Sequence, residues 1–212
     1  MEHAKRQFAL TGYALLSMRN IAKDTKISPS VIYHYFKDKD ELLQVIFDET
    51  SHRLGQERAA LKVSKDARAM MHERVLFQID HAEDVVFVLK YYLYNRKKFE
   101  KQSDKGYVPP KAYLHIEEVL ERGVESGEFI ELDIPSEAKV ITHAINGYLL
   151  EYYPETPTGK EREDLAKTIS NFILRSIERR GVWIEKDVDE PKAHTKKPAS
   201  QWSADLSSKT II

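Results

Sequence analysis

The side chains best suited to recognition chemistry lie close together in the chain, between Ser28 and Tyr35. A short helix is expected here, and its Ile32 would face inward and leave hydroxyl and aromatic groups outside. Outward serine and tyrosine hydroxyls can bond the edges of DNA bases, and Pro29 and Val31 can contact the methyl group of thymine. This stretch therefore has the chemistry of a helix that reads the major groove of DNA.

The residues around this stretch predict the helices that would position it. Ser17 is a suitable N-cap for a helix over residues 18–25. Ser28 caps the next helix, with Pro29 at the first helical position, where its missing N–H has no effect. Only two residues separate the two helices, as a helix-turn-helix requires.

A third, longer helix is expected to begin after Asp38, which forms a capping box with Glu41. Lys39 lies in its first turn, where the helix dipole disfavours a cation unless an anion is close. A DNA phosphate would supply that anion. The candidate DNA-binding residues are Ser17, Arg19, Ser28, Pro29, Ser30, Val31, Tyr33, His34, Tyr35 and Lys39.

A helix-turn-helix is also a common structural corner, and outward tyrosines can pack against a neighbouring domain, so this pattern alone leaves DNA binding open. Over about the first fifty residues, however, the chain resembles the DNA-binding domain of the tetracycline-repressor-like (TetR) family of bacterial transcription regulators. The matching positions are Gly12, Tyr13, Ser17, Arg19, Ile21, Ala22, Tyr33, Tyr35, Phe36, Lys39, Leu42 and Leu43. The resemblance implies a DNA-binding regulator.

The chain departs from the family pattern at two places in this segment. Lys26 stands where the family usually has glycine, so either this lysine has a left-handed backbone or the turn differs slightly. Leu15 and Leu16 replace a pair that is more often polar. Beyond the first fifty residues the likeness is a looser one, to a helix end and Gly-Glu-Phe turn at 119–130.

Charge and composition agree with localised DNA binding. The 212-residue chain has a net charge of −1, yet its first 39 residues hold seven Lys and Arg against three Asp and Glu. A basic N-terminal face on an acidic body suits local phosphate contact. The chain has no cysteine, and it has no membrane-length apolar run or signal-peptide pattern. We therefore expect a cytoplasmic protein without a membrane partner.

The absence of any long strand alternation predicts an all-α fold. We expect a helix-turn-helix DNA-binding domain at 1–50, an effector-binding and dimerisation domain at 51–181, and a flexible tail at 182–212. A polar loop is expected at 101–110. The expected later helices cover residues 38–62, 66–100, 111–125, 136–153 and 160–180.

The helix expected at 66–100 is apolar on two sides, so other helices should surround it. In the TetR family the equivalent helix lines an effector cavity. The many tyrosines favour an amphipathic or aromatic effector, although the same side chains could simply form core. The candidate effector-binding residues are Phe77, His81, Asp84, Val88 and Tyr92, joined by Tyr113 and Glu117 from the next helix.

The last two expected helices each carry an apolar stripe and a second apolar edge, so one face could meet a second subunit. In the family this pair of helices forms a two-fold four-helix bundle, and the resulting homodimer reads a palindromic operator. The candidate interface residues are Ile145, Leu149, Tyr152, Leu165, Ile169, Phe172 and Ile173.

Enzyme chemistry is poorly supported by the sequence. A di-iron bundle needs two Glu-x-x-His motifs, and only residues 49–52 supply one. No HExxH, Walker loop or glycine-rich dinucleotide turn is present, so we expect no catalytic residue, metal or cofactor. Two functions remain: a repressor released by a small-molecule effector, or a DNA-bound dimer that acts through a protein partner without an effector.

Overall fold

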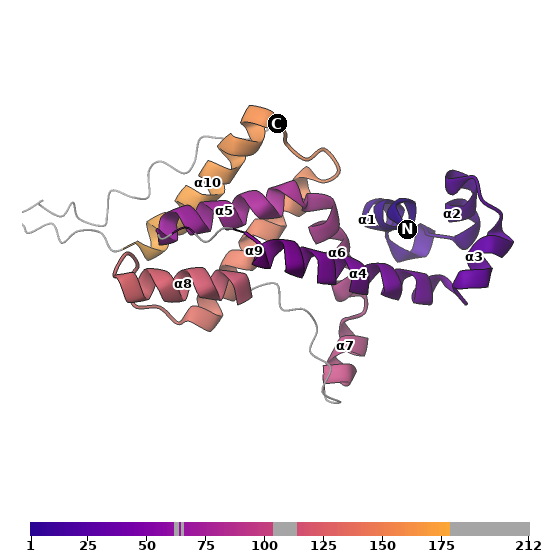
Figure 1. Cartoon of the computed structure of the whole chain (residues 1–212), viewed down its shortest axis with the longest axis horizontal. Coiled ribbons are helices and arrows are strands. Elements are labelled where there is room, and N and C mark those ends of the chain that lie inside the picture. The colour runs from indigo at the N-terminus through magenta and orange to yellow at the C-terminus, as the bar shows by residue number, and fades with distance from the viewer. Residues whose placement is uncertain (62–63, 65, 104–113, 179–212) are drawn as a thin grey trace, which may run out of the picture. The chain divides into compact units, whose positions relative to one another are not determined.

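Helices joined by short turns make up the described part of the computed structural model, which confirms the expected all-α class (Figure 1). The structure describes residues 1–61, 64, 66–103 and 114–178. The expected tail and all but the start of the expected loop at 101–110 lie outside these ranges. None of the helices within these ranges combines the length and apolar character needed to cross a lipid bilayer.

The N-terminal helices form as their capping residues predict. The Ser17 and Ser28 hydroxyl oxygens accept hydrogen bonds from amides three residues later, at 3.1 and 3.4 Å, and an Asp38 carboxylate oxygen does so at 2.9 Å. Each bond satisfies an amide that the first helical turn leaves unpaired. The four helices are α1 (Glu2–Leu15), α2 (Met18–Thr25), α3 (Pro29–Tyr35) and α4 (Lys39–Ala59).

Lys26 has the left-handed backbone that its place in the turn suggested, with φ 57° and ψ 31°. Its amide donates to the Lys23 carbonyl at 3.2 Å, and the Ile27 amide donates to the Ala22 carbonyl at 3.1 Å. These bonds satisfy the carbonyls at the end of α2, as a left-handed C-terminal cap does. The tight corner between α2 and α3 therefore forms without the usual glycine.

The helix expected at 66–100 was wrong as a single element, because the chain bends twice within it. His81 has φ −109° and ψ 25°, and its ring Nδ1 lies 2.9 Å from the Phe77 carbonyl. Asn95 has φ −98° and ψ 13°, and its amide side chain donates to the Tyr91 carbonyl at 3.1 Å. Such side chains compete with the helical hydrogen bonds. The segment becomes α5 (Ala67–Asp80), α6 (Ala82–Tyr94) and α7 (Arg96–Ser103).

The remaining helices follow the expected order, with shifted ends. The expected start of the third-last helix, at residue 111, lies outside the described residues, and α4 ends at Ala59 instead of near residue 62. Pro135 occupies the first turn of the next helix, which therefore begins two residues before its expected start at Ser136. These helices are α8 (Leu114–Ser126), α9 (Ile134–Tyr152) and α10 (Gly159–Ile177).

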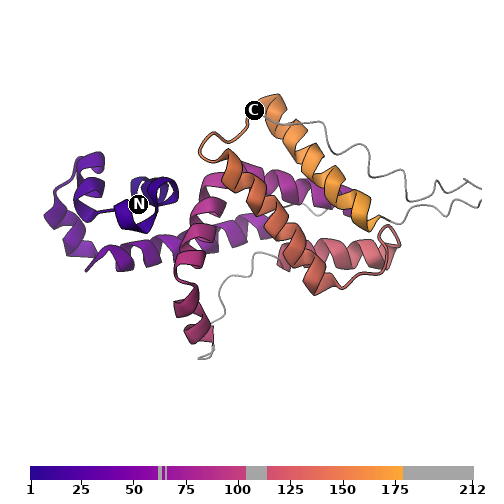
Figure 2. The same cartoon turned by 180° about the vertical axis from the view of Figure 1, so that it is seen from behind.

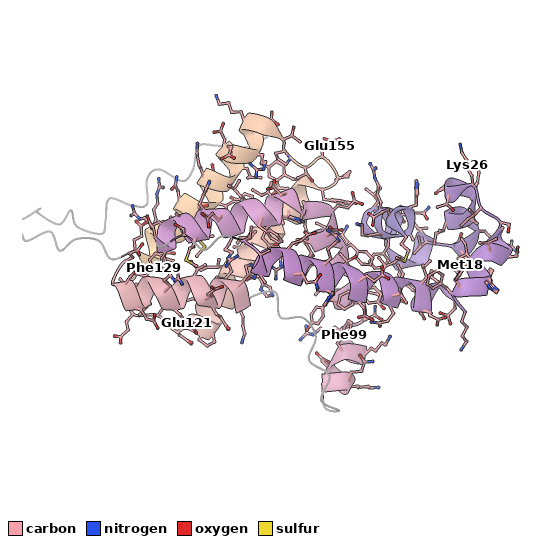
Figure 3. All side chains as sticks on the ribbon, in the orientation of Figure 1. Met18, Lys26, Phe99, Glu121, Phe129 and Glu155 are labelled. Carbon is pink, nitrogen blue, oxygen red and sulfur yellow. The ribbon has the colours of Figure 1, made fainter. Side chains whose placement is uncertain are left out.

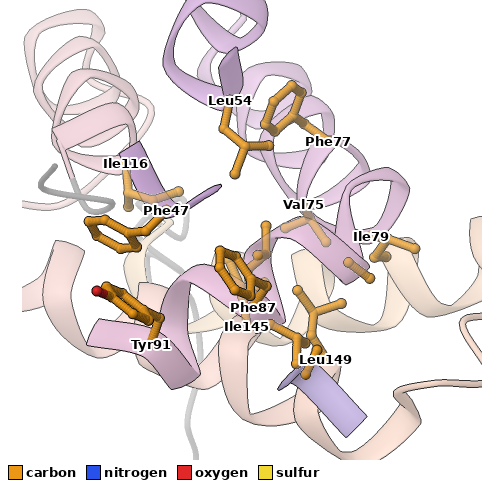
Figure 4. Close-up of a cluster of buried hydrophobic side chains, with 14 of the residues drawn as sticks. Phe47, Leu54, Val75, Phe77, Ile79, Phe87, Tyr91, Ile116, Ile145 and Leu149 are labelled. Carbon is orange, nitrogen blue, oxygen red and sulfur yellow. The ribbon is translucent and has the colours of Figure 1, made fainter. Parts of the chain in front are cut away.

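One continuous core joins the N-terminal helices to the rest of the described chain. Figure 4 shows Phe47 of α4 facing Tyr91 of α6, and their ring centroids lie 4.9 Å apart. Phe8 of α1 contacts Phe87 of α6 edge-to-face at 5.5 Å. The helix α6 thus packs against both α1 and α4. Because α4 crosses residue 50, the two expected domains share a helix.

The Gly-Glu-Phe turn after α8 ties three helices together. Phe129 is fully buried and lies against Gly123, where an added Cβ would come within 2.0 Å of the phenyl ring. The Glu128 carboxylate accepts from the Ala67 amide at 3.1 Å, at the N-terminus of α5. The Ile130 amide donates to the Ile177 carbonyl at the end of α10, at 2.9 Å. The loose family likeness at 119–130 therefore corresponds to a structural clasp.

Candidate nucleic-acid interface

The exposed face of α3 carries the aromatic and hydroxyl groups expected from the sequence. Tyr33 and Tyr35 are 53% and 71% exposed, whereas Ile32 is buried against the neighbouring helices. The Ser28 and Ser30 hydroxyls lie 2.8 Å apart and both are exposed. Pro29, Val31 and His34 are exposed as well. This surface offers donors, acceptors and apolar contacts of the kind that read base edges.

Several cations around α3 are available for phosphate contact. Arg19, Lys23, Lys26 and Lys37 are exposed, and within the described ranges none of them lies in an ion pair with a carboxylate. Figure 3 shows the Lys26 side chain pointing away from the N-terminal helices. Ser17 differs, because its hydroxyl already caps α2. Unpaired cations beside a reading helix would position it on the DNA backbone.

The ammonium of Lys39 has partners within the protein, where the sequence suggested a DNA phosphate. Its ammonium donates to the carbonyls of Tyr13 and Leu16 at 2.8 and 2.9 Å, and it lies 3.7 Å from the centre of the Tyr13 ring. Carbonyl oxygens and a ring face replace the expected anion. Lys39 therefore fastens the end of α1 to the start of α4.

A buried ion-pair cluster attaches α1 to the rest of the chain. The Asp84 carboxylate of α6 lies 2.5 Å from the Lys5 ammonium of α1 and 2.5 Å from the Arg53 guanidinium of α4. Burial raises the pKa of Asp84, but the hydrogen bonds from Lys5 and Arg53 outweigh it and hold the pKa below its usual value of 3.8. The cluster fixes where the N-terminal helices meet α6.

Two of the residues expected to bind an effector are satisfied by protein partners. Asp84 belongs to the ion-pair cluster, and the His81 Nε2 lies 2.8 Å from the Glu57 carboxylate. The cavity that both residues line is open, has a volume of about 390 Å³ and is otherwise surrounded by charged side chains. Both side chains therefore have protein partners, and their binding to an effector stays a prediction.

The other expected effector residues lie on three different helices, because the bend at His81 divides the expected helix at 66–100. Phe77 lies on α5, where its ring stacks on His81 at 4.1 Å. On α6, Val88 is half-buried and Tyr92 stacks on Phe99 at 5.5 Å. Glu117 is half-buried on α8. The remaining candidate, Tyr113, lies outside the described residues.

The interior of the helical bundle holds polar groups that the sequence interpretation missed. Gln78 is buried on α5, and its Nε2 lies 3.2 Å from the His115 Nε2 of α8. The Gln78 Oε1, the Thr142 Oγ1 and the Asn146 Oδ1 are shielded from solvent, and no described residue bonds them. The sequence contained an indication of these buried polar groups, because Thr142 interrupts an apolar stripe and Gln78 follows the apolar Val75 by one helical turn. Buried polar groups without a hydrogen-bond partner are energetically unfavourable.

The expected dimer surface needs correction, because most of its residues lie inside the single chain. Tyr152 and Phe172 are exposed, and Phe172 is 71% accessible. The second apolar edge of α9 is exposed too, with Val140 65% accessible and Tyr148 close by on the same helix. In the view from behind (Figure 2), α9 and α10 lie in the foreground. The residues buried in the core instead are Ile145, Leu149, Leu165, Ile169 and Ile173.

Comparisons with known proteins agree with this geometry at the N-terminus. Residues 1–46 match the family model described as bacterial regulatory proteins, tetR family. No curated protein sequence matches the chain.

Solved structures share the fold over most of the chain. A tetR-family regulatory protein from Rhodococcus RHA1 is similar with a TM-score of 0.63 and 20% identity, over 85% of this chain and 95% of that one. The ketosteroid transcriptional regulator KstR2 of Mycobacterium tuberculosis has a TM-score of 0.60 and 19% identity, over 84% and 93%. A transcriptional regulator from Saccharomonospora viridis, solved with choline, has a TM-score of 0.60 and 20% identity, over 84% and 95%.

These similar proteins are transcription regulators and not enzymes, in agreement with the sequence. The structural likeness, at such low identity, shows the fold, while the match over residues 1–46 covers the helix-turn-helix and its flanking helices. Both point to one family. Residues 1–46 therefore match the DNA-binding domain of bacterial regulatory proteins of the tetR family, and the chain shares its fold with solved regulators of that family.

Proposed function

We propose that this regulator is a homodimeric repressor that binds a palindromic operator through α3 and leaves it when a small effector binds. The observation that carries DNA recognition is the exposed face of α3, with Tyr33 and Ser30. Arg19, at the start of α2, is exposed and has no ion pair among the described residues. Hydroxyl and aromatic groups read base edges, and cations around them set the position on the backbone.

Dimerisation through α9 and α10 is supported by the apolar side chains that both helices expose. Val140 and Tyr148 on α9 and Phe172 on α10 are accessible in the single chain. Large apolar groups gathered on one face usually mark an interaction surface. A two-fold pairing of this face would place two α3 helices so that they read the two halves of a palindrome.

An amphipathic effector is supported by the mixed character of the bundle interior. The unmet polar atoms of Gln78, Thr142 and Asn146 occur on α5 and α9, among buried apolar side chains. A ligand with polar and apolar parts could satisfy both kinds of group. The similar protein from Saccharomonospora viridis was solved with choline, and the name of KstR2 refers to ketosteroids, so small organic ligands occur on this fold.

Coupling between the two halves would run through α4 and α6. The helix α4 begins beside α3 and ends beside α5, and α6 contacts both α1 and α4. An effector that favours one arrangement of these helices changes operator affinity by its differential affinity for the two states, about 1–3 kcal/mol.

Selection from a random DNA pool tests this function directly. The purified protein should enrich a palindrome whose half-sites lie one or more helical turns apart. Enrichment of single half-sites would contradict the dimer, and no enrichment would contradict DNA reading. A thermal-shift screen of small organic compounds then separates the two mechanisms, because an effector must raise the melting temperature by mass action. A protein that binds operator but no compound would favour action through a protein partner.

A further inference from the structure

Arg58, near the C-terminal end of α4, has a guanidinium without a counter-ion in the described part of the chain. No carboxylate oxygen there lies within 4.0 Å of its nitrogens. Its Nε is shielded from solvent and no described residue bonds it. Buried or partly buried charges in proteins are normally paired, so this arginine is unusual.

The neighbouring carboxylates are occupied elsewhere. Glu57, the preceding residue, lies 3.3 Å from Arg53 and 2.8 Å from His81. Glu118 of α8 lies 3.2 Å from Arg74, which is itself buried. Neither acid is thus available to neutralise Arg58.

A second guanidinium lies beside Arg58 and increases the local positive charge. Arg74 donates through NH1 to the backbone carbonyl of Arg58 at 3.2 Å, so the two residues are held together. Burial, and then the charge of Arg74, lower the pKa of Arg58 to about 10. Arg58 nevertheless stays protonated at neutral pH, and an uncompensated cation remains between α4, α5 and α8.

An aromatic ring forms the apolar part of this site. The Phe77 ring centroid lies 5.4 Å from the Arg58 Cζ. Figure 4 shows Phe77 beside Leu54, one helical turn before Arg58 on α4. A charged group at Arg58 would thus have an apolar surface next to it.

We propose that Arg58 binds the anionic group, a carboxylate or a phosphate, of an amphipathic effector whose apolar part contacts Phe77. A guanidinium can bond either anion with two parallel N–H groups, which gives both strength and orientation. This inference deepens the proposed effector function and rests on it, since it names the chemical class of the effector. Binding at Arg58 would act on the end of the helix that begins in the DNA-binding domain.

Three probes with the same eight-carbon chain distinguish the head groups. Melting temperatures are measured at constant ionic strength with octanoate, octyl phosphate and 1-octanol. One or both anions should raise the melting temperature of the full chain, and the alcohol should raise it far less. The stabilisation should rise with the logarithm of one plus the ratio of anion concentration to dissociation constant. Octanoate and octyl phosphate act as separate arms, so the preferred anion is read from the larger shift.

Variants of Arg58 test whether that stabilisation depends on the guanidinium. Arg58→Met should weaken anion binding at least about tenfold, because a charge-assisted bond is lost. Without any probe it should melt at a higher temperature than the parent, since an unpaired charge is removed. Arg58→Lys keeps the charge but not the two-pronged geometry and should bind with intermediate affinity. The matched control is Arg68→Met, in which the exposed partner of Glu178 is removed and the anion response should persist.

Two results would overturn the proposal. One is an equal response to anions in the parent and in Arg58→Met, and the other is a parent that neither anion stabilises. Operator binding is measured separately and without probes, so a failed anion site does not affect the evidence for DNA recognition. A parent protein that does not bind the operator would instead contradict the proposed DNA-binding function.

Discussion

Lys5 and Asp84, 79 residues apart in the chain, form a buried ion pair in which the ammonium and the carboxylate lie 2.5 Å apart. Arg53 of α4 bonds the second oxygen of the same carboxylate. One side chain of α6 therefore holds both a helix of the DNA-binding region and the helix that leads out of it. This contact therefore attaches α1 and α4 to α6.

Asp84→Asn should destabilise the protein by about 2 kcal/mol at pH 7, because Lys5 loses its buried counter-ion and keeps only the exposed carboxylate of Glu2. The pKa of Asp84 is lower in the folded chain than its usual 3.8. Its contribution is therefore complete above about pH 4 and is lost as the pH falls through the folded pKa. Chemical denaturation of parent and variant at several pH values measures this. A difference in stability that stays constant down to pH 2 would contradict the pairing.

Lys26→Gly should stabilise the protein by about 1 kcal/mol, since Lys26 holds a left-handed backbone that glycine adopts without steric cost. The expected result is a higher midpoint in urea with an unchanged slope. Lys23→Gly serves as the control, because this residue lies within α2, where glycine should destabilise the helix. If Lys26→Gly also lowers the midpoint, the lysine side chain stabilises the fold by more than its left-handed backbone destabilises it.

Arg19 and Lys39 should respond differently to substitution, because only Arg19 is free for phosphate. Arg19→Ala should weaken binding to all DNA and reduce the salt dependence by about one phosphate per subunit. Lys39→Met should instead lower the melting temperature, since the carbonyls of Tyr13 and Leu16 lose their donor. Binding titrations over a salt series, with melting curves, check both. Similar losses of salt dependence in the two variants would show that Lys39 also contacts phosphate.

Phe172→Asp should break the dimer while leaving the fold of each chain intact, because this ring is exposed in the single chain. In a two-fold interface the new charge would be buried without a partner in both subunits. Light scattering should give the mass of one chain, with an unchanged helical signal in circular dichroism. Leu93→Asp, at a position of α6 that is 55% exposed, should remain dimeric. A dimeric Phe172→Asp would place the interface elsewhere.

The DNA-binding part of the fold was predictable because its determinants are local. Ser17, Ser28 and Asp38 cap helices through bonds that span three residues, and such spacing is visible in the sequence. The bends at His81 and Asn95 were not, since the apolar stripe from Val75 to Leu93 continues past His81 and Asn95 stands among other polar residues.

The candidate effector and dimer sites were harder to predict because they depend on packing between distant segments. Apolar periodicity placed Ile145 and Ile169 on helix faces correctly, but it could not say whether a face meets the same chain or a partner. Asp84 forms ion pairs with Lys5 and Arg53, which lie in other helices, so its partners were not visible in the local sequence. Arg58 was missed for the same reason, since its lack of a counter-ion appears only when the neighbouring acids are placed.

The central claim is that α3 reads DNA sequence, and fluorescence anisotropy with the selected operator and a scrambled duplex tests it most directly. Tyr33→Ala removes an exposed ring and hydroxyl from α3, and Tyr33→Phe removes only the hydroxyl. Tyr33→Ala should lose at least about tenfold in preference for the operator, or about 1.4 kcal/mol, while scrambled DNA binds as before. A Tyr33→Ala protein that still separates operator from scrambled DNA as well as the parent does would contradict the assignment of α3 as the reading helix.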